Sequence, residues 1–227
     1  MNGPLRGLYA ITPEDTAAQT SAPDKALPDQ VLLGQVAAAI AGGARLVQYR
    51  DKSGPGRHRH ARAAALVQLC QTLGVPLIVN DDLELALAVG AAGVHLGRDD
   101  ADPAAARARL GADAIIGVSC YDSLDLAEAA KQAGADYVAF GSFFPSAVKP
   151  HAVRPALDLL TRARARLAIP LVAIGGITPQ NAGLLIAAGA DMLAVITGIF
   201  AAPDITAAAR AYCRLFDTGA RPREHSR

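Results

Sequence analysis

The sequence predicts a single-domain α/β protein, a (β/α)8 TIM barrel, and two observations lead to this prediction. A Gly or Ala step followed by a short apolar run recurs along the 227 residues, and segments of helical length, rich in Ala and Leu, lie between these runs. Short, near-continuous apolar runs are typical of parallel strands that are covered on both faces. Eight such repeats in about 210 residues fit a barrel, which can be as short as about 200 residues. A doubly wound open sheet rarely needs so many even repeats.

The repeats define the expected elements. The apolar runs that predict strands are GLYAIT from Gly7, GGARLVQY from Gly42, GVPLIVND from Gly74, AAGVHLG from Ala91, GADAIIGVS from Gly111, GADYVAFG from Gly134, AIPLVAIGG from Ala168 and GADMLAVITG from Gly189. The helical segments include Val31 to Ala41, Arg59 to Leu73, Leu83 to Val89, Leu124 to Ala133, Pro179 to Ala188 and Ile205 to Phe216. We expect the barrel to span residues 1–217, with a long loop at 13–29 after the first strand and a disordered tail at 218–227.

Composition excludes several classes of protein. Lys and Arg total 22 against 21 Asp and Glu, so the net charge of +1 gives no broad basic field for nucleic acid. No apolar run approaches the roughly 20 residues of a membrane helix, and the N-terminus lacks the charge order of a secretory signal. We therefore expect a soluble, cytoplasmic protein. Cys70, Cys120 and Cys213 are far apart and form no CxxC, which favours three buried thiols over a disulfide or a zinc site.

Polar residues at the ends of the strands are the candidates for function, because barrel active sites lie at the carboxyl ends of the strands. After the second strand, Gln48, Arg50 and Lys52 alternate and share one side while the chain stays extended. A guanidinium and an ammonium together suit a phosphate or a diphosphate. The alternative is that Arg50 and Lys52 pair with Asp51 and Asp81 in an exposed loop.

Two carboxylates follow the third and fourth strands. Asp81 and Asp100 could converge on one Mg²⁺, which takes one or two protein carboxylates together with water and phosphate oxygens. The alternative for the NDD segment is a helix N-cap, a role that Asp82 fits better than Asp81, and Asp99 and Asp102 similarly favour the start of the helix that Pro103 opens.

Glycines after the last two strands suggest a second phosphate site. Gly175-Gly176 and Thr197-Gly198 follow the seventh and eighth strands, where barrels often bind phosphate through backbone amides. A double glycine can equally be a plain turn. Two phosphate sites on one mouth point to a transferase rather than an isomerase. His95 lies inside the fourth strand and is expected to be a hydrogen-bonded core residue.

The strand ends QYRDK, NDD, HLGxxD, GVS, FPSxxK and AIGGI, in this order, resemble the thiamine phosphate synthase family from Gly7 to Phe216. The resemblance implies a cytoplasmic transferase of thiamine biosynthesis on a TIM barrel. Its two phosphorylated substrates would be hydroxymethylpyrimidine diphosphate and thiazole phosphate, its products thiamine phosphate and diphosphate, and its cofactor Mg²⁺. It also implies a dissociative step, in which diphosphate leaves before the thiazole nitrogen attacks. The oligomeric state, a homo-oligomer included, is left open.

The resemblance also implies roles for individual residues. It assigns the pyrimidine diphosphate to Gln48, Arg50, Lys52, Asn80, Ser119 and Lys149, the thiazole phosphate to Ser146, Val148, Gly176, Ile196 and Thr197, and Mg²⁺ to Asp81 and Asp100. Lys149, Arg50 and Lys52 would be catalytic, because they neutralise charge on the leaving diphosphate.

One position departs from the family pattern. The loop after the sixth strand usually contains Thr-x-Thr-Lys, but this chain has Ser146, Val148 and Lys149 there, so one hydroxyl is missing. That change keeps a non-catalytic phosphate-binding paralogue among the alternatives. The other alternative is a thiazole tautomerase of the same superfamily, in which a histidine stands where this chain has Tyr121.

Overall fold

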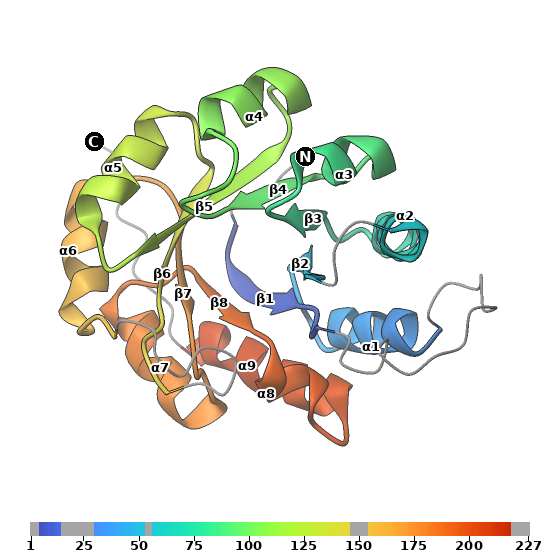
Figure 1. Ribbon diagram of the computed structural model, residues 1–227. Coiled ribbons are helices and arrows are strands. Elements are labelled where there is room, and N and C mark those ends of the chain that lie inside the picture. Colours follow the sequence, from blue (N-terminus) through green and yellow to red (C-terminus); the bar gives the residue numbers. More distant parts are fainter. Residues whose placement is uncertain (1–4, 15–29, 53–55, 146–153, 219–227) are drawn as a thin grey trace.

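The computed structural model describes residues 5–14, 30–52, 56–145 and 154–218. Within these ranges eight parallel strands close into a barrel in sequence order, and helices surround the barrel (Figure 1). The predicted (β/α)8 barrel is confirmed. The strands are β1 (Gly7–Ile11), β2 (Leu46–Tyr49), β3 (Leu77–Asn80), β4 (Gly93–Leu96), β5 (Ile115–Tyr121), β6 (Tyr137–Gly141), β7 (Leu171–Ile174) and β8 (Met192–Val195). The helices are α1 (Gln30–Ala41), α2 (Arg57–Thr72), α3 (Leu83–Val89), α4 (Pro103–Leu110), α5 (Leu124–Gln132), α6 (Asp158–Arg166), α7 (Pro179–Ala188), α8 (Thr197–Phe200) and α9 (Ile205–Thr218).

Alternation along the strands separates two cores. One set of side chains fills the barrel interior: Tyr9, Ile11, Leu46, Ile78, Ile115, Tyr137, Ala139, Val172, Met192 and Ala194. The strand residues between them, such as Val47, Val94 and Phe140, pack outward against the helices. The near-continuous apolar runs of the sequence therefore reflect burial on both faces of each strand.

The even-numbered strands begin in the same way. Each is preceded by Gly, Ala and one further residue, and that further residue is Arg45, Ala92, Asp136 or Asp191. Its backbone N–H donates to the preceding strand or its edge at 2.8 Å, with Leu8, Leu77, Ile116 and Leu171 as the acceptors. The glycine has a positive φ in all four copies, between 65° and 126°, which ends the helix and turns the chain into the strand. This repeated turn explains why a Gly or Ala step precedes the apolar runs in the sequence.

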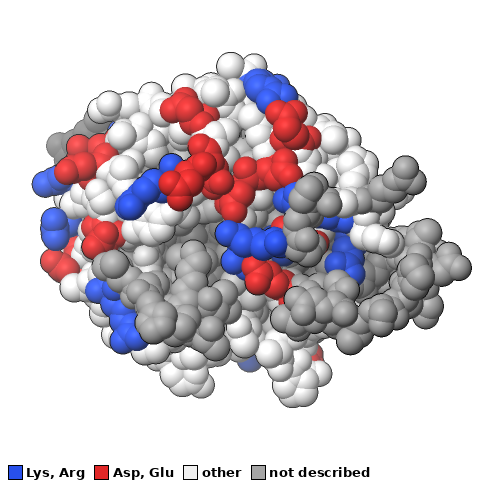
Figure 2. Space-filling view, viewed as in Figure 1, with Lys and Arg blue, Asp and Glu red and all other residues white. Residues whose placement is uncertain are grey.

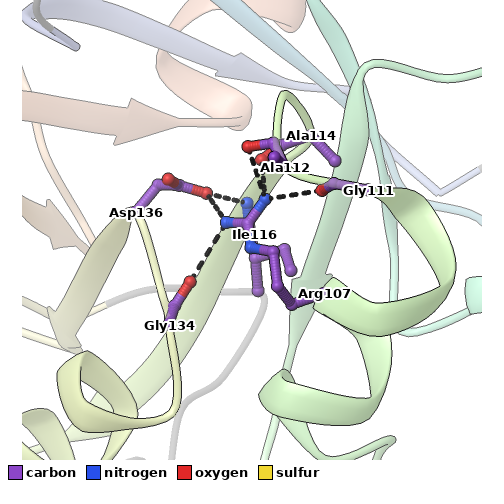
Figure 3. A network of polar contacts seen from close by, with 7 residues as sticks. All are labelled: Arg107, Gly111, Ala112, Ala114, Ile116, Gly134 and Asp136. Atoms are coloured by element: carbon purple, nitrogen blue, oxygen red, sulfur yellow. Dashed lines mark hydrogen bonds and ion pairs between the residues drawn. The ribbon is translucent and has the colours of Figure 1, made fainter.

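An arginine clamps one of these turns (Figure 3). Arg107 of α4 donates to the carbonyls of Gly111, Ala112 and Ala114 through Nη1 at 2.6–3.2 Å, and to the carbonyl of Gly134 through Nη2 at 3.0 Å. Its Nη2 also lies 2.5 Å from Asp136 Oδ2, which accepts the N–H of Ile116 at 2.7 Å. One guanidinium thus joins the loop before β5 to the loop before β6.

The same clamp recurs two repeats later. Arg164 of α6 donates to the carbonyls of Leu167, Ile169 and Gly189 and pairs with Asp191. Asp191 accepts the N–H of Leu171 at 2.8 Å, as Asp136 accepts that of Ile116. Both clamps lie at the amino ends of the strands, away from the edge where barrel sites form.

The structure corrects some details of the predicted layout. Helix α9 runs through Thr218, so the first residue of the predicted tail is helical. Cys70 and Cys120 are buried, but Cys213 is only partly buried, and none of the three is in a disulfide. Most of the predicted loop, residues 15–29, and the rest of the tail, residues 219–227, lie outside the described residues. No helix among the described residues is long and apolar enough to cross a membrane.

Arg107→Ala is expected to lower the free energy of unfolding by about 2 kcal/mol, because several backbone carbonyls and one carboxylate lose a charged donor. Urea denaturation followed by circular dichroism measures the change. Arg109→Ala on the same helix is the matched control, because within the described part of the chain Arg109 pairs only with the exposed Glu84. This substitution should leave the transition unchanged. Equal effects from the two substitutions would contradict the clamp.

Candidate functional site

The end of β2 brings one of the three predicted residues into the barrel and leaves two at its mouth. Gln48 is only 2% exposed and donates through Nε2 to the Tyr9 hydroxyl, so its amide is part of the barrel interior. The Arg50 side chain is 13% exposed and the Lys52 side chain 55%. Exposure therefore increases from Gln48 through Arg50 to Lys52, as the chain passes from the barrel interior to the mouth.

Arg50 is held at the mouth by the segment that follows β1. Its backbone N–H donates to Thr12 Oγ1 at 2.9 Å, and its Nη1 lies 2.6 Å from Glu14 Oε1. Sequence reasoning missed Glu14 because it falls in the segment predicted as a loop. The predicted alternative, a pair with Asp51, is wrong, because Asp51 accepts the Tyr49 hydroxyl on the outer face of the barrel.

Asp81 and Asp100 lie close together, as predicted from their positions after adjacent strands. Asp81 adopts a left-handed backbone, with φ 63°, and its N–H donates to the carbonyl of His95 at 2.8 Å. Asp100 Oδ2 accepts the N–H of Gly97 at 2.6 Å. Lys52 Nζ lies 3.4 Å from Asp81 Oδ2, so this part of the alternative reading of the loop is confirmed.

The two carboxylates repel each other. The pKa of Asp100 is raised, first by burial and then by the hydrogen bond and charge of Asp81, while the Gly97 amide and the Lys52 ammonium oppose the rise. A pair of oxygen donors whose charges are incompletely neutralised suits a hard divalent cation such as Mg²⁺. No cluster of three or more His, Cys, Asp or Glu that could hold a metal occurs among the described residues. A metal here would therefore complete its shell with water or ligand oxygens.

The neighbouring aspartates have structural roles that the sequence indicated. Asp82 caps α3 by accepting the N–H of Leu85 at 2.9 Å, and it pairs with Arg59 at 2.6 Å. Asp102 caps α4 by accepting the N–H groups of Ala104 and Ala105. Asp81 and Asp100 differ from these residues, because the helix caps of α3 and α4 are Asp82 and Asp102.

Ser119 faces the barrel interior near the end of β5. Its Oγ lies 2.8 Å from His95 Nε2, and His95 Nδ1 lies 2.8 Å from the Tyr137 hydroxyl. The prediction that His95 is a hydrogen-bonded core residue is confirmed. Asn80 is the last residue of β3 and pairs in register with His95. Sequence reasoning missed Tyr9 and Tyr137, which look like ordinary apolar strand residues in the period-two pattern.

The loops after β7 and β8 lie beside each other. A Cβ on Gly176 would come within 2.3 Å of the Pro145 carbonyl oxygen, so the glycine allows the β6 loop to approach closely. A Cβ on Gly198 would come within 2.3 Å of the Tyr212 hydroxyl, which donates to the carbonyl of Ile177 at 2.9 Å. Ile196 directly follows β8, and Thr197 is the first residue of α8. Gly176 and Gly198 thus allow close packing, whichever ligand the loops bind.

Three predicted site residues, Ser146, Val148 and Lys149, lie outside the described residues. Tyr121, at the position that separates the tautomerase alternative, has φ 55° and packs its ring 4.9 Å below Arg98 Cζ. Figure 2 shows acidic and basic side chains crowded together near the centre of the face that it presents.

A closed barrel with charged side chains at the carboxyl ends of its strands places the chain in the class of (β/α)8-barrel enzymes. The sequence model of the family described as "Thiamine monophosphate synthase" matches residues 8–199. The chain belongs to this family.

Individual relatives agree with this assignment. The chain is 56% identical over 210 residues to a thiamine-phosphate synthase of Thiobacillus denitrificans, covering 92% of this chain and 94% of the relative. It is 55% identical over 212 residues to a protein of the same name from an Azoarcus species, covering 93% and 98% of the two chains.

The solved structures include close likenesses as well. The thiamine phosphate pyrophosphorylase of Pyrococcus furiosus superposes with a TM-score of 0.78 at 32% identity, covering 95% of this chain and 97% of that one. A 3-hexulose-6-phosphate synthase, at 14% identity and a TM-score of 0.64 over 92% of this chain and 99% of that one, shares the fold alone.

Proposed function

We propose that this protein is a thiamine-phosphate synthase, which joins hydroxymethylpyrimidine diphosphate to thiazole phosphate and releases diphosphate. The observation that carries the proposal is the 56% identity to a relative of that name over more than nine-tenths of both chains. The family match over residues 8–199 supports it independently.

The reaction conserves atoms and electrons without an added acid or base. The bond between the pyrimidine methylene carbon and the diphosphate oxygen breaks, and its electron pair leaves with diphosphate. The thiazole nitrogen then supplies the pair for the new C–N bond. Charge develops on the leaving diphosphate, so fixed cations at the mouth accelerate the step.

The mouth offers suitable groups for the diphosphate. Arg50 can grip phosphate oxygens through two N–H groups, and Lys52 can follow them as a mobile point charge. Within the described residues each of these cations has a single carboxylate partner at its head group, Glu14 for Arg50 and Asp81 for Lys52. A diphosphate therefore competes with one carboxylate for each cation. Lys149 is proposed as the third cation, on the strength of its place in the sequence motif.

Asp81 and Asp100 are the proposed holders of Mg²⁺, and their mutual repulsion supports this assignment. When bound, Mg²⁺ would neutralise diphosphate charge as a Lewis acid. Gln48, Asn80 and Ser119 are proposed to meet the pyrimidine, because all three side chains come from interior positions, on β2, β3 and β5 of the same barrel.

The loops after β7 and β8 are the proposed site for the thiazole phosphate, through Gly176, Ile196 and Thr197, with Ser146 and Val148 completing it. Backbone amides next to glycines can approach a phosphate closely. The tautomerase alternative is not favoured, because Tyr121 replaces its histidine and the relatives carry the synthase name.

The proposed activity is tested with the purified chain, both substrates and Mg²⁺. Thiamine phosphate and diphosphate should appear in equal amounts. Chromatography measures the first product and a diphosphate assay the second. Binding of both substrates without diphosphate release would identify a non-catalytic paralogue and contradict the proposal.

Asp100→Asn should raise the unfolding temperature in buffer with a chelator, because it removes a carboxylate that Asp81 repels while keeping an oxygen to accept the Gly97 N–H. Mg²⁺ should raise the unfolding temperature of the wild type and have little effect on the variant. Differential scanning calorimetry measures both. Asp102→Asn is the control, because its carboxylate caps α4; an Mg²⁺ response retained by Asp100→Asn would remove Asp100 from the metal site.

Glu14→Gln should lower the Michaelis constant for the pyrimidine diphosphate by up to about fivefold, the ratio that corresponds to an exposed ion pair of about 1 kcal/mol. The reason is that Glu14 occupies the Arg50 guanidinium at 2.6 Å when no diphosphate is bound. Glu84→Gln, which alters an exposed pair between α3 and α4, serves as the control. A raised constant in Glu14→Gln would mean that Glu14 holds Arg50 in its binding position.

A further inference from the structure

A chain of hydrogen bonds crosses the barrel interior and joins two of the proposed pyrimidine contacts. It runs from Gln48 on β2 through Tyr9 on β1, Tyr137 on β6 and His95 on β4 to Ser119 on β5. The Tyr9 and Tyr137 hydroxyl oxygens lie 3.0 Å apart, and both His95 nitrogens lie 2.8 Å from their partners. The first four side chains are buried, so each of their hydrogens needs a protein acceptor.

In this chain of hydrogen bonds, only one order of donors and acceptors gives every buried hydrogen an acceptor. The Gln48 Nε2 group can only donate, so the Tyr9 oxygen accepts and the single hydroxyl hydrogen of Tyr9 is left for Tyr137. The hydrogen of Tyr137 must then go to His95 Nδ1. A neutral imidazole that accepts at Nδ1 carries its hydrogen at Nε2, and that hydrogen points at Ser119 Oγ. The first link cannot be reversed because an amide nitrogen only donates, and reversing the second or third link leaves a buried tyrosine hydrogen without an acceptor, which is costly. Reversing the last link alone would make both imidazole nitrogens acceptors, which a neutral imidazole cannot provide.

Both tyrosines stay protonated, as this order requires. Burial raises the pKa of Tyr9 and of Tyr137 above the ordinary value for a phenol, and the nearby Tyr9 raises that of Tyr137 further. Each hydroxyl therefore contributes one hydrogen to the chain over the whole neutral range of pH.

Ring packing and a glycine hold the chain in place. Tyr9 and Tyr137 pack edge to face with centroids 5.9 Å apart, and the His95 ring stacks on Tyr137 at 5.6 Å. Gly117 on β5 pairs in register with Tyr137. A Cβ at Gly117 would lie 1.9 Å from Tyr137 Cζ and 2.2 Å from its hydroxyl oxygen. The glycine of the GVS segment thus makes room for the tyrosine that reaches His95.

We infer that Tyr9, Tyr137 and His95 are positioning residues that make the Ser119 hydroxyl a hydrogen-bond donor toward the mouth. Because Ser119 Oγ accepts the Nε2–H of His95, its own hydrogen is the one available to a ligand. The ligand atom that fits it is an acceptor with a lone pair, as a pyrimidine ring nitrogen is. A group that can only donate would have to use the remaining lone pair of Ser119 Oγ, and the Ser119 hydrogen would gain no acceptor from the ligand, so such a group fits less well.

This inference rests on the proposed function for the identity of the ligand, but its core can be tested without turnover. The ¹⁵N shifts of labelled histidine at neutral pH should show His95 as the Nε2–H tautomer, with the signal assigned by its loss in His95→Asn. In Tyr137→Phe the acceptor nitrogen loses its donor, so the Nδ1–H form should gain population. A wild-type Nδ1–H tautomer would overturn the inference, whether or not the protein proves to be a synthase.

Kinetics then test the link to the substrate. His95→Gln can place an amide N–H near the position of Nε2, whereas the shorter amide of His95→Asn reaches only the position of Nδ1. We expect His95→Asn to raise the Michaelis constant for the pyrimidine diphosphate about three- to tenfold, the ratio that corresponds to one lost hydrogen bond. His95→Gln should stay nearer the wild type, and the constant for thiazole phosphate should change by less than about twofold in both.

Tyr49→Phe is the matched control. Tyr49 is as buried as Tyr9 and Tyr137, but its hydroxyl donates to Asp51 on the outer face of the barrel. It should reduce stability and leave the constant for the pyrimidine diphosphate unchanged. A purely structural role for His95 predicts lowered unfolding temperatures with equal constants in His95→Asn and His95→Gln, and that result would overturn the inference.

Discussion

Closure of the barrel is the constraint from which the other features follow. Eight parallel strands in one ring turn every second side chain into a single interior, where water is scarce and polar groups must satisfy one another. Toward the amino ends, apolar residues such as Leu46, Ile115 and Met192 fill this interior. Further along the axis the hydrogen-bonded chain from Gln48 to Ser119 takes their place, and the charged residues of the mouth follow. Polarity thus increases along the axis toward the carboxyl ends of the strands.

This gradient ties the candidate site to the core. Tyr137 belongs both to the interior cluster and to the hydrogen-bonded chain, and it requires the missing side chain of Gly117. A substitution at Gly117 therefore acts on packing and on the orientation of Ser119 at once. The cost of burying the polar groups of Gln48, Tyr9, Tyr137 and His95 is offset because each hydrogen bond between them pairs a donor with an acceptor, so these side chains depend on one another.

The sequence predicted the barrel correctly because its signal is repeated. The positive-φ glycine and the hydrogen bond that follows it occur at four strands, so one ambiguous segment could not change the predicted fold. Asp82 and Asp102 were separable from Asp81 by helix-cap chemistry. Tyr9 and Tyr137 were not identified, since alternation shows that a residue is buried but does not show which partner its hydroxyl meets across the ring. The Arg50–Glu14 pair was missed because it joins positions 36 apart, and nothing local in the sequence indicates it.

Arg107 and Arg164 differ from Arg50 and Lys52 in the number and kind of their partners. Arg107 and Arg164 each bind several backbone carbonyls as well as an aspartate, and those carbonyls belong to turns that begin strands. A ligand could not replace these partners without unfolding the turns, so the two guanidiniums are committed to the fold. Among the residues that the structure describes, Arg50 has one carboxylate at its head group, and so does Lys52. A carboxylate is an anion that a phosphate oxygen can replace with little change in charge, at the cost of one ion pair that is half exposed. The amino ends of the strands therefore hold cations that stabilise the barrel, while the carboxyl ends hold cations that can exchange one anion for another.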